Sequence, residues 1–247
     1  MPIYSPFNAK SFLSRLKSKI SRLVFGAPAP IYYLESYSQE GEDLVLNRIF
    51  DSKISGFYVD IGAHHPKRFS NTYFFYQRGW RGINIDAMPN SMTIFNQERP
   101  FDINLEIAIM GEQGLATYYQ FNEPALNGFS ESISSGRDGL RDYKIINRTT
   151  ISGMPLSDVL DRHMPPNTSI DFLTIDVEGL DFDVLKSNNW DRFRPKVILI
   201  EILASNLDSL ISDPISTYLL GMEYRLYAKT LNTVFFVSNE FLTGELC

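Results

Sequence analysis

The chain has 247 residues, 44% of them hydrophobic and 13% aromatic, which is enough for one large α/β domain with a short extension. Its only cysteine is Cys247, which excludes a disulfide framework and favours a reducing, cytoplasmic environment. The net charge of −6 argues against nucleic acid as the main partner. No apolar run is long enough to span a bilayer.

Charge is unevenly distributed along the chain. Residues 1–34 hold five basic residues and no acidic one, so the remainder carries −11. Apolar residues recur at helical spacing from Phe12 to Val24, which predicts a basic amphipathic helical arm and linker over residues 1–31. Two roles fit the arm: packing on the domain or on a partner subunit, and peripheral contact of residues 10–25 with the inner face of a membrane. The main domain is expected over residues 32–247.

Helical and strand patterns alternate from residue 36 onward. The capping-box spacing of Ser36 and Gln39 predicts a helix over residues 39–50. Further helices are predicted over residues 71–78, 90–97, 157–163 (capped by Ser157) and 182–187, and strands over 56–61, 82–86, 103–109, 170–176 and 196–201. A strand predicted over 115–121 pairs back after a turn. Residues 122–148 are predicted to be a lid, a binding loop or disordered. Strands predicted over 224–227 and 233–237 form a closing hairpin.

Four of the predicted apolar strands end in an acid: Asp60, Asp86, Asp176 and Glu201. Strands that alternate with helices indicate a doubly wound, mostly parallel α/β sheet. Because the carboxyl ends of parallel strands meet at one edge, where ligands bind, the four acids are expected to border one crevice.

The first of these strand ends, residues 56–66 (GFYVDIGAHHP), favours one type of cofactor. It contains a single glycine, Gly62, at the place where a dinucleotide-binding loop needs several for a pyrophosphate. S-adenosylmethionine (SAM) has no phosphate and carries a cationic amino group, for which Asp60 is the candidate counter-charge. Asp86, 26 residues later, is placed to bind the ribose hydroxyls, and Glu106 is a weaker candidate near the adenine or ribose.

A second acidic group follows the strand over 170–176. Asp176 and Glu178 lie two residues apart and face the same way in an extended segment, and Glu201 joins them from the next strand end. One of these acids could act as a general base toward a hydroxyl, and together they could hydrogen-bond a sugar or hold Mg²⁺ or Mn²⁺. A base or substrate-binding role is favoured over a metal site.

Two histidines, His64 and His65, lie in the loop after the first strand, beside the expected donor. A neutral imidazole there could take a proton from an alcohol near neutral pH. Adjacent residues of an extended segment point in different directions, so one of the two is expected to do so.

Three segments resemble the FkbM family of SAM-dependent methyltransferases: residues 58–64 (YVDIGAH), 84–89 (NIDAMP) and 171–179 (DFLTIDVEG). The resemblance spans residues 37–201. It implies the seven-stranded, Rossmann-like class I methyltransferase fold, with the last two strands antiparallel, and O-methylation of sugars, polyketides or other secondary products. The chain departs from the family in having Asp86-Ala87-Met88-Pro89 where Glu-Pro is common, and His64-His65-Pro66 where a turn with a small polar residue and glycine is usual.

Together, the residues and the resemblance predict a SAM-dependent O-methyltransferase acting on a hydroxyl of a carbohydrate, a glycan precursor or a secondary metabolite. Residues expected at the cofactor are Asp60, Gly62, Ala63, Asp86, Ala87, Glu106 and Asp176. The catalytic candidates are Glu178, His64 and Asp176, and the substrate-binding candidates are His65, Phe129, Ser130, Arg137 and Glu201. The alternatives are an NAD-dependent oxidoreductase or epimerase on the same sheet and a non-catalytic adaptor at a membrane.

Overall fold

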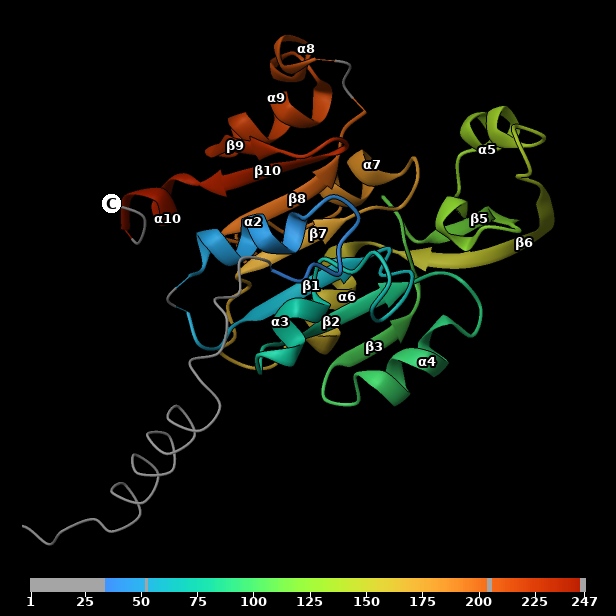
Figure 1. Cartoon of the computed structure of the whole chain (residues 1–247). Coiled ribbons are helices and arrows are strands. Elements are labelled where there is room, and N and C mark those ends of the chain that lie inside the picture. The colour runs from blue at the N-terminus through green and yellow to red at the C-terminus, as the bar shows by residue number, and fades with distance from the viewer. Residues whose placement is uncertain (1–33, 52, 204–205, 245–247) are drawn as a thin grey trace, which may run out of the picture. The chain divides into compact units, whose positions relative to one another are not determined.

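The structure, a computed structural model, describes residues 34–51, 53–203 and 206–244 (Figure 1). The helical arm expected over residues 1–31 lies outside the described residues. All the elements below belong to the compact unit Ser36–Cys247. Within the described part of the chain, no helix is both long and apolar enough to cross a membrane.

A seven-stranded sheet forms the centre of this unit, in the order β3-β2-β1-β7-β8-β10-β9. Its strands are β1 (Phe57–Ile61), β2 (Arg81–Asp86), β3 (Ile103–Glu106), β7 (Phe172–Ile175), β8 (Val197–Glu201), β9 (Tyr224–Lys229) and β10 (Thr233–Ser238). All neighbours are parallel except β10, which is antiparallel to both β8 and β9. This confirms the doubly wound sheet, and the strand order reverses between β1 and β7, where such sheets open a crevice.

Helices cover both faces of the sheet. One apolar cluster joins the sheet to α2 (Glu42–Ile49), α3 (Tyr73–Gln77) and α10 (Asn239–Gly244). The other joins the opposite face to α6 (Leu156–His163), α7 (Asp181–Lys186), α8 (Leu207–Ile211) and α9 (Pro214–Gly221). Tyr58 belongs to the first cluster and Val59 to the second, because successive side chains of a strand point to opposite faces. The helix α4 (Ser91–Glu98) contributes Met92 and Phe95 to a third cluster.

Two predicted helix caps are wrong. The helix α2 begins at Glu42, after Gly41, and the hydroxyls of Ser36 and Ser38 instead donate to the Asp43 carboxylate at 2.7 and 2.9 Å. The helix α6 begins at Leu156, whose N–H donates to the Ser187 hydroxyl at 2.9 Å, so Ser157 lies inside the helix. At α6 a partner distant along the chain replaces the local cap, whereas at α2 the predicted cap donates to a side chain of the helix itself.

A second sheet, with the order β4-β6-β5, is inserted between β3 and α6. Its strands are β4 (Ala108–Ile109), β5 (Gly114–Phe121) and β6 (Ile145–Met154). The strand predicted over 103–109 is therefore divided between two sheets. The strand predicted over 115–121 is confirmed as β5, but its antiparallel partner is β6 rather than the strand before it. We call residues 108–154 the insertion; Figure 1 shows it projecting beyond the end of β3.

The segment 122–148, predicted to be a lid, a binding loop or disordered, is largely folded. It contains a 3₁₀ turn, η1 (Pro124–Leu126), the helix α5 (Glu131–Arg137) and the start of β6. Most of the side chains of β6 are exposed or half-buried, so the strand lacks the apolar run that marks the central strands.

The turn after β1 generates a stability prediction. Gly62 has φ +81, and a Cβ added there would lie 1.7 Å from the backbone oxygen of Asp176. Gly62→Ala should therefore lower the free energy of unfolding by about 2–6 kcal/mol, from backbone strain and overpacking together. Gly139 has φ +82 but nothing within 4 Å, so Gly139→Ala should cost only about 1–2 kcal/mol. Urea denaturation measures both; equal losses would contradict the role of the Asp176 carbonyl.

Candidate active site

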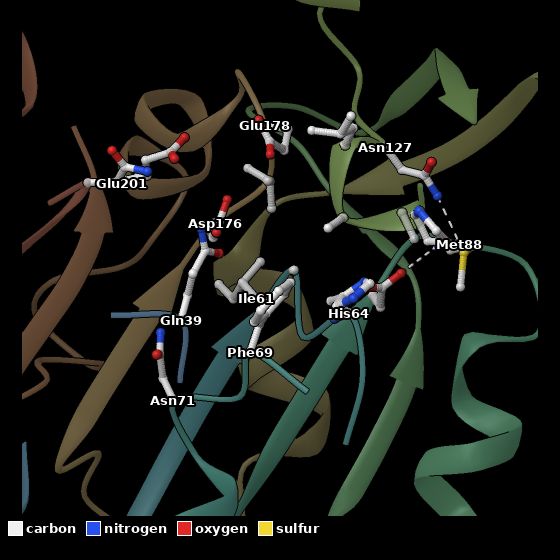
Figure 2. A pocket seen from close by; sticks show the side chains of 18 of the residues that line it. Gln39, Ile61, His64, Phe69, Asn71, Met88, Asn127, Asp176, Glu178 and Glu201 are labelled. Carbon is white, nitrogen blue, oxygen red and sulfur yellow. Dashed lines mark hydrogen bonds between the residues drawn. The ribbon is translucent and has the colours of Figure 1, made fainter. Parts of the chain in front are cut away.

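A cavity of about 430 Å³ lies at the carboxyl ends of the central strands. Ile61, Asp86, Asp176 and Glu201 line it from the ends of β1, β2, β7 and β8, and the insertion adds further residues. Figure 2 shows Glu201, Asp176 and Glu178 gathered at one end and His64, Met88 and Asn127 at the other. The cavity therefore has an acidic half and a more apolar half, on the two sides of the point where the strand order reverses.

Asp86 is the polar centre of the apolar half. It is 8% exposed, and its two carboxylate oxygens accept hydrogen bonds from the N–H groups of His64 at 2.8 Å and Met88 at 2.7 Å. Burial raises the pKa of Asp86, and the two backbone N–H groups oppose that shift. A carboxylate has about four acceptor sites, so two remain for a diol. Tyr118 and Phe129 of the insertion add apolar surface beside it.

Asn127, which the sequence did not single out, ties the insertion to the loop after β2. Its side-chain oxygen accepts from the Phe121 N–H at 2.7 Å, and its amide nitrogen donates to the Met88 sulfur at 3.4 Å. An ion pair of 3.0 Å between Arg68 and Glu123 joins the insertion to the loop after β1. All of these except Phe121 line the cavity, so the insertion forms one of its walls.

Asp60 is not among the residues that line the cavity, which corrects its expected position. Its carboxylate accepts from the Thr72 hydroxyl at 2.7 Å, and that hydroxyl accepts from the Arg99 guanidinium at 2.9 Å. Burial raises the pKa of Asp60 to about 6, although nearby Arg99 opposes the shift. The parallel register pairs Asp60 with Asn84, two residues before Asp86. Asp60 therefore lies further from the strand ends, and from the cavity, than Asp86 does.

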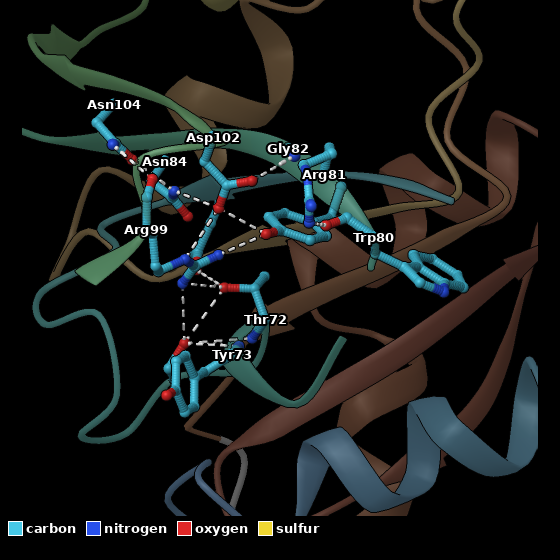
Figure 3. Close-up of polar contacts among 12 residues, drawn as sticks. Thr72, Tyr73, Trp80, Arg81, Gly82, Asn84, Arg99, Asp102 and Asn104 are labelled. Atoms are coloured by element: carbon cyan, nitrogen blue, oxygen red, sulfur yellow. Dashed lines mark hydrogen bonds and ion pairs between the residues drawn. The ribbon is translucent and has the colours of Figure 1, made fainter. Parts of the chain in front are cut away.

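Arg99 and Asp102 are fully buried and form the centre of a polar network (Figure 3). The Arg99 guanidinium donates to Asp102 at 2.9 Å and to the Tyr58 hydroxyl at 2.7 Å. The Tyr58 hydroxyl in turn donates to Asp102 at 2.6 Å, and the Gly82 N–H donates to the same carboxylate at 3.0 Å. These bonds fix the positions of β1, β2 and the start of β3 relative to one another. No sequence motif marked the network.

The acidic half is built on two neighbouring strand ends. The parallel register pairs Ile175 with Ile200, so the next residues, Asp176 and Glu201, lie side by side. Among the described residues, none donates a hydrogen bond to either carboxylate. The Arg137 guanidinium donates to Glu178, and the N–H groups of Val177 and Gly179 donate to Asp181.

The pKa values of these two acids are raised. Asp176 is exposed to the cavity. The protein packed around its carboxylate is nevertheless the main reason why the pKa of Asp176 is raised, ahead of the charges of Glu201 and Glu178. Burial, followed by the charges of Glu178 and Asp181, raises the pKa of Glu201 to about 7.

Glu178 differs from these two acids because it has a cationic partner. Its carboxylate forms a 2.7 Å ion pair with Arg137 of α5, and both side chains line the cavity. Burial raises the pKa of Glu178, and Arg137 opposes the shift. The residue has φ +53, a conformation that non-glycine residues adopt rarely.

The loop that carries Glu178 is packed directly on the insertion. A Cβ added to Gly128 would lie 2.8 Å from the Glu178 Cβ, and one added to Gly179 would lie 2.7 Å from the Ser130 Cβ. Asp181, which sequence reasoning missed, accepts from the N–H groups of Val177 at 3.0 Å and Gly179 at 3.1 Å and so holds the loop from the other side. An acid in the first turn of a helix is the signal that could have identified it.

The two histidines have separate roles. His64, with φ +52, lines the cavity, and burial followed by nearby Arg68 lowers the pKa of its imidazole, which favours the neutral form. The His65 ring accepts hydrogen bonds from the N–H groups of Lys67 at 3.1 Å and Arg68 at 3.0 Å. It does not line the cavity, so its expected substrate contact is replaced by a role in the turn.

The structure brings most of the remaining predicted residues together. The predicted residues that line the cavity are Gly62, His64, Asp86, Ala87, Phe129, Arg137, Asp176, Glu178 and Glu201. Ala63 instead packs in an apolar cluster with Met92 and Phe95, and Glu106 is exposed at the end of β3. Ser130 caps α5, where its hydroxyl accepts from the Ile133 N–H at 3.4 Å. In the part of the chain that the structure describes, no group of three or more His, Cys, Asp or Glu side chains is placed to hold a metal ion.

The burial of Asp60 predicts a pH dependence of stability. Because its pKa is about 6 in the folded protein against an ordinary 3.8, the folded state binds the proton more tightly, and stability falls as the pH rises from about 4 to 6. Asp60→Asn should remove this loss. Its free energy of unfolding, relative to that of the wild type, should therefore rise by about 1–3 kcal/mol between pH 4 and pH 7.5. Urea unfolding at both pH values measures it, with Glu112→Gln, at an exposed position, as control. A difference between Asp60→Asn and wild type that stays constant with pH would contradict the assignment.

Comparison with known proteins gave one family and several solved structures. The chain is similar to a TehB-like SAM-dependent methyltransferase from Corynebacterium glutamicum, with 9% identity, a TM-score of 0.37 and coverage of 94% of this chain and 100% of that one. It is also similar to an O-methyltransferase from Bacillus cereus in complex with SAH, with 10% identity, a TM-score of 0.38 and coverage of 96% and 94%. A search among curated proteins found no match.

The family match is the more informative finding. Residues 60–226, well over half of the chain, match the methyltransferase FkbM domain, and this stretch contains the end of β1, the strands β2, β7 and β8, and the whole insertion. The chain therefore belongs to the FkbM family of SAM-dependent methyltransferases.

Proposed function

We propose that this protein transfers a methyl group from SAM to a hydroxyl of a carbohydrate, a glycan precursor or another polyhydroxylated metabolite. The observation that supports this is the division of one cavity into two unlike halves. One half has a single buried carboxylate, Asp86, among apolar side chains, and the other is bordered by carboxylates and amides.

The apolar half fits the cofactor of the family. The free acceptor sites of Asp86 suit the two ribose hydroxyls, and Met88, Tyr118 and Phe129 provide apolar surface for a flat base. Asn127 holds Met88 in place from the insertion. When bound, SAM supplies a methyl group on a positively charged sulfur, and the acidic half of the cavity provides the opposite charge.

The acidic half fits an acceptor with several hydroxyl groups. Its lining includes the amides of Gln39, Asn71 and Asn232 and the carboxylates of Glu40 and Glu201. The Asn71 amide nitrogen donates to the Thr174 hydroxyl at 3.0 Å, which leaves its side-chain oxygen for a ligand. Carboxylate and amide groups can each bind two neighbouring hydroxyls, because they present two polar atoms in one plane.

The residues around the cavity can align the reactants and take up a proton. The insertion forms one wall of the cavity. Excluding water while holding two reactants in line provides much of the rate enhancement in such transfers. Glu178, His64 and Asp176 are the candidate bases that line the cavity. The neutral form of His64 suits a base, whereas Glu178 is engaged by Arg137.

The alternative of an NAD-dependent enzyme lacks a place for a pyrophosphate. The loop after β1 has one glycine at its start, and the Asp176 carbonyl occupies the space that this glycine leaves. His64, His65 and Pro66 follow, and a dinucleotide fingerprint would need further glycines there.

Calorimetric titration with SAM tests the cofactor assignment. The wild type should bind SAM, and Asp86→Asn should weaken binding by about 10–100-fold, because it removes a charged acceptor worth about 1.5–3 kcal/mol. Glu106→Gln is the matched control: Glu106 pairs with Asp86 across β2 and β3 but is exposed, so the affinity should not change. Absence of SAM binding by the wild type would defeat the proposed function.

Incubation with methyl-labelled SAM and a panel of acceptors tests the substrate class. The panel should contain monosaccharides and nucleotide-linked sugars together with matched amines and thiols. The expected result is label in a product whose NMR spectrum shows a methyl ether. Label found only on nitrogen or sulfur would contradict the assignment to a hydroxyl.

A further inference from the structure

We propose that Asp176 and Glu201 act as a carboxylate pair that shares one proton before SAM binds, releases it on binding, and then accepts the hydroxyl proton of the acceptor. This inference rests on the proposed methyl transfer. It assigns the base to a pair of side chains, and it gives Glu201 a part in the chemistry beyond the substrate contact expected from the sequence.

The backbone places the two residues on neighbouring strand ends. The register of β7 and β8 makes Asp176 and Glu201 neighbours on adjacent parallel strands, which are about 4.8 Å apart. Both side chains line the cavity (Figure 2). No described residue donates a hydrogen bond to either carboxylate, so nothing in the described protein compensates their charges directly.

The surroundings of the pair are mostly acidic. Glu178 and Asp181 face it from the turn after β7 and from α7, Glu40 from the segment before α2, and Asp60 from β1. Arg137 is the cation that acts on Glu201, and it is engaged in the 2.7 Å ion pair with Glu178.

Among so many negative charges, ionising both neighbouring carboxylates is energetically unfavourable. The two groups therefore titrate as a pair with one proton between them. The raised pKa values of Asp176 and Glu201, the latter about 7, agree with this.

The neighbouring acids have other partners and are therefore not members of the pair. Glu178 is bound by Arg137, and Asp181 accepts from two backbone N–H groups. The Glu40 carboxylate accepts from the Asn232 N–H at 2.9 Å. Glu178 is consequently a positioning residue in this scheme, because it fixes the loop next to the pair.

The proton and electron balance of the step is simple. The hydroxyl oxygen gives its proton to the pair as it gains the methyl group, and the sulfur keeps the electrons of the broken sulfur–carbon bond. The products are a methyl ether, a neutral thioether and a protonated carboxylate, which returns its proton to water. To accept that proton the pair must first be ionised, and a cationic ligand nearby favours ionisation.

Calorimetry in two buffers tests this inference without an acceptor. SAM is titrated into the full-length protein at about pH 6.5, once in phosphate and once in Tris, because the buffer-dependent part of the heat counts the protons released. The wild type should release close to one proton per SAM bound. Glu201→Gln should bind SAM with this release reduced at least threefold, whereas Glu112→Gln, an exposed acid away from the cavity, should match the wild type.

Equal heats in both buffers for the wild type would overturn the pair, and so would undiminished proton release from Glu201→Gln. Glu201→Asp guards against a folding defect, because it keeps a carboxylate on a shorter side chain and should restore the release. Loss of release from Glu201→Asp in a folded, SAM-binding variant would count against the pair as well. Failure of the wild type to bind SAM would defeat the proposed function, and it is a different result from binding without proton release.

Discussion

The contact between the turn after β1 and the end of β7 sets the geometry of the whole site. Gly62 lies against the Asp176 backbone, its N–H donates to Ile85 at 2.9 Å, and the Asp176 N–H donates to Ile61 at 3.0 Å. Three strand ends are thereby joined at the point where the strand order reverses. The cofactor half forms on the side of β2 and the acidic half on the side of β8. A side chain at position 62 would push the turn after β1 away from the end of β7.

The buried network around Arg99 supports the same arrangement from within the sheet. A buried ion pair is weak evidence for stability, because desolvation offsets much of the attraction, but removing one partner of such a pair typically costs about 3–5 kcal/mol. Arg99, Asp102 and Tyr58 connect β1 to the start of β3, while Thr72 extends the network to Asp60. The position of Asp86 at the end of β2 depends on this frame, although Asp86 itself takes no part in it.

The sequence predicted the central sheet well because four of its strands, β1, β2, β7 and β8, are apolar runs with an acid at or next to their ends. It could not place the insertion, since β6 has mostly polar, exposed side chains, and its pairing with β5 joins residues more than 20 positions apart. The sequence did not reveal the position of Asp60, because the partners that hold it, Thr72 and through it Arg99, lie 12 and 39 residues further along the chain. The cap at Ser36 failed because its hydroxyl donates to Asp43 inside the helix, and the cap at Ser157 failed because the distant Ser187 caps the helix instead.

The tight packing between the insertion and the turn after β7 limits how this enzyme can change its substrate. Gly128 and Gly179 each face the other loop without room for a methyl group, and the ion pair of Arg137 with Glu178 spans the same boundary. A change of backbone in one loop therefore demands a matching change in the other. Evolution or engineering of acceptor preference is easier at side chains that line the acidic half of the cavity, such as Asn71, than through exchange of either loop alone.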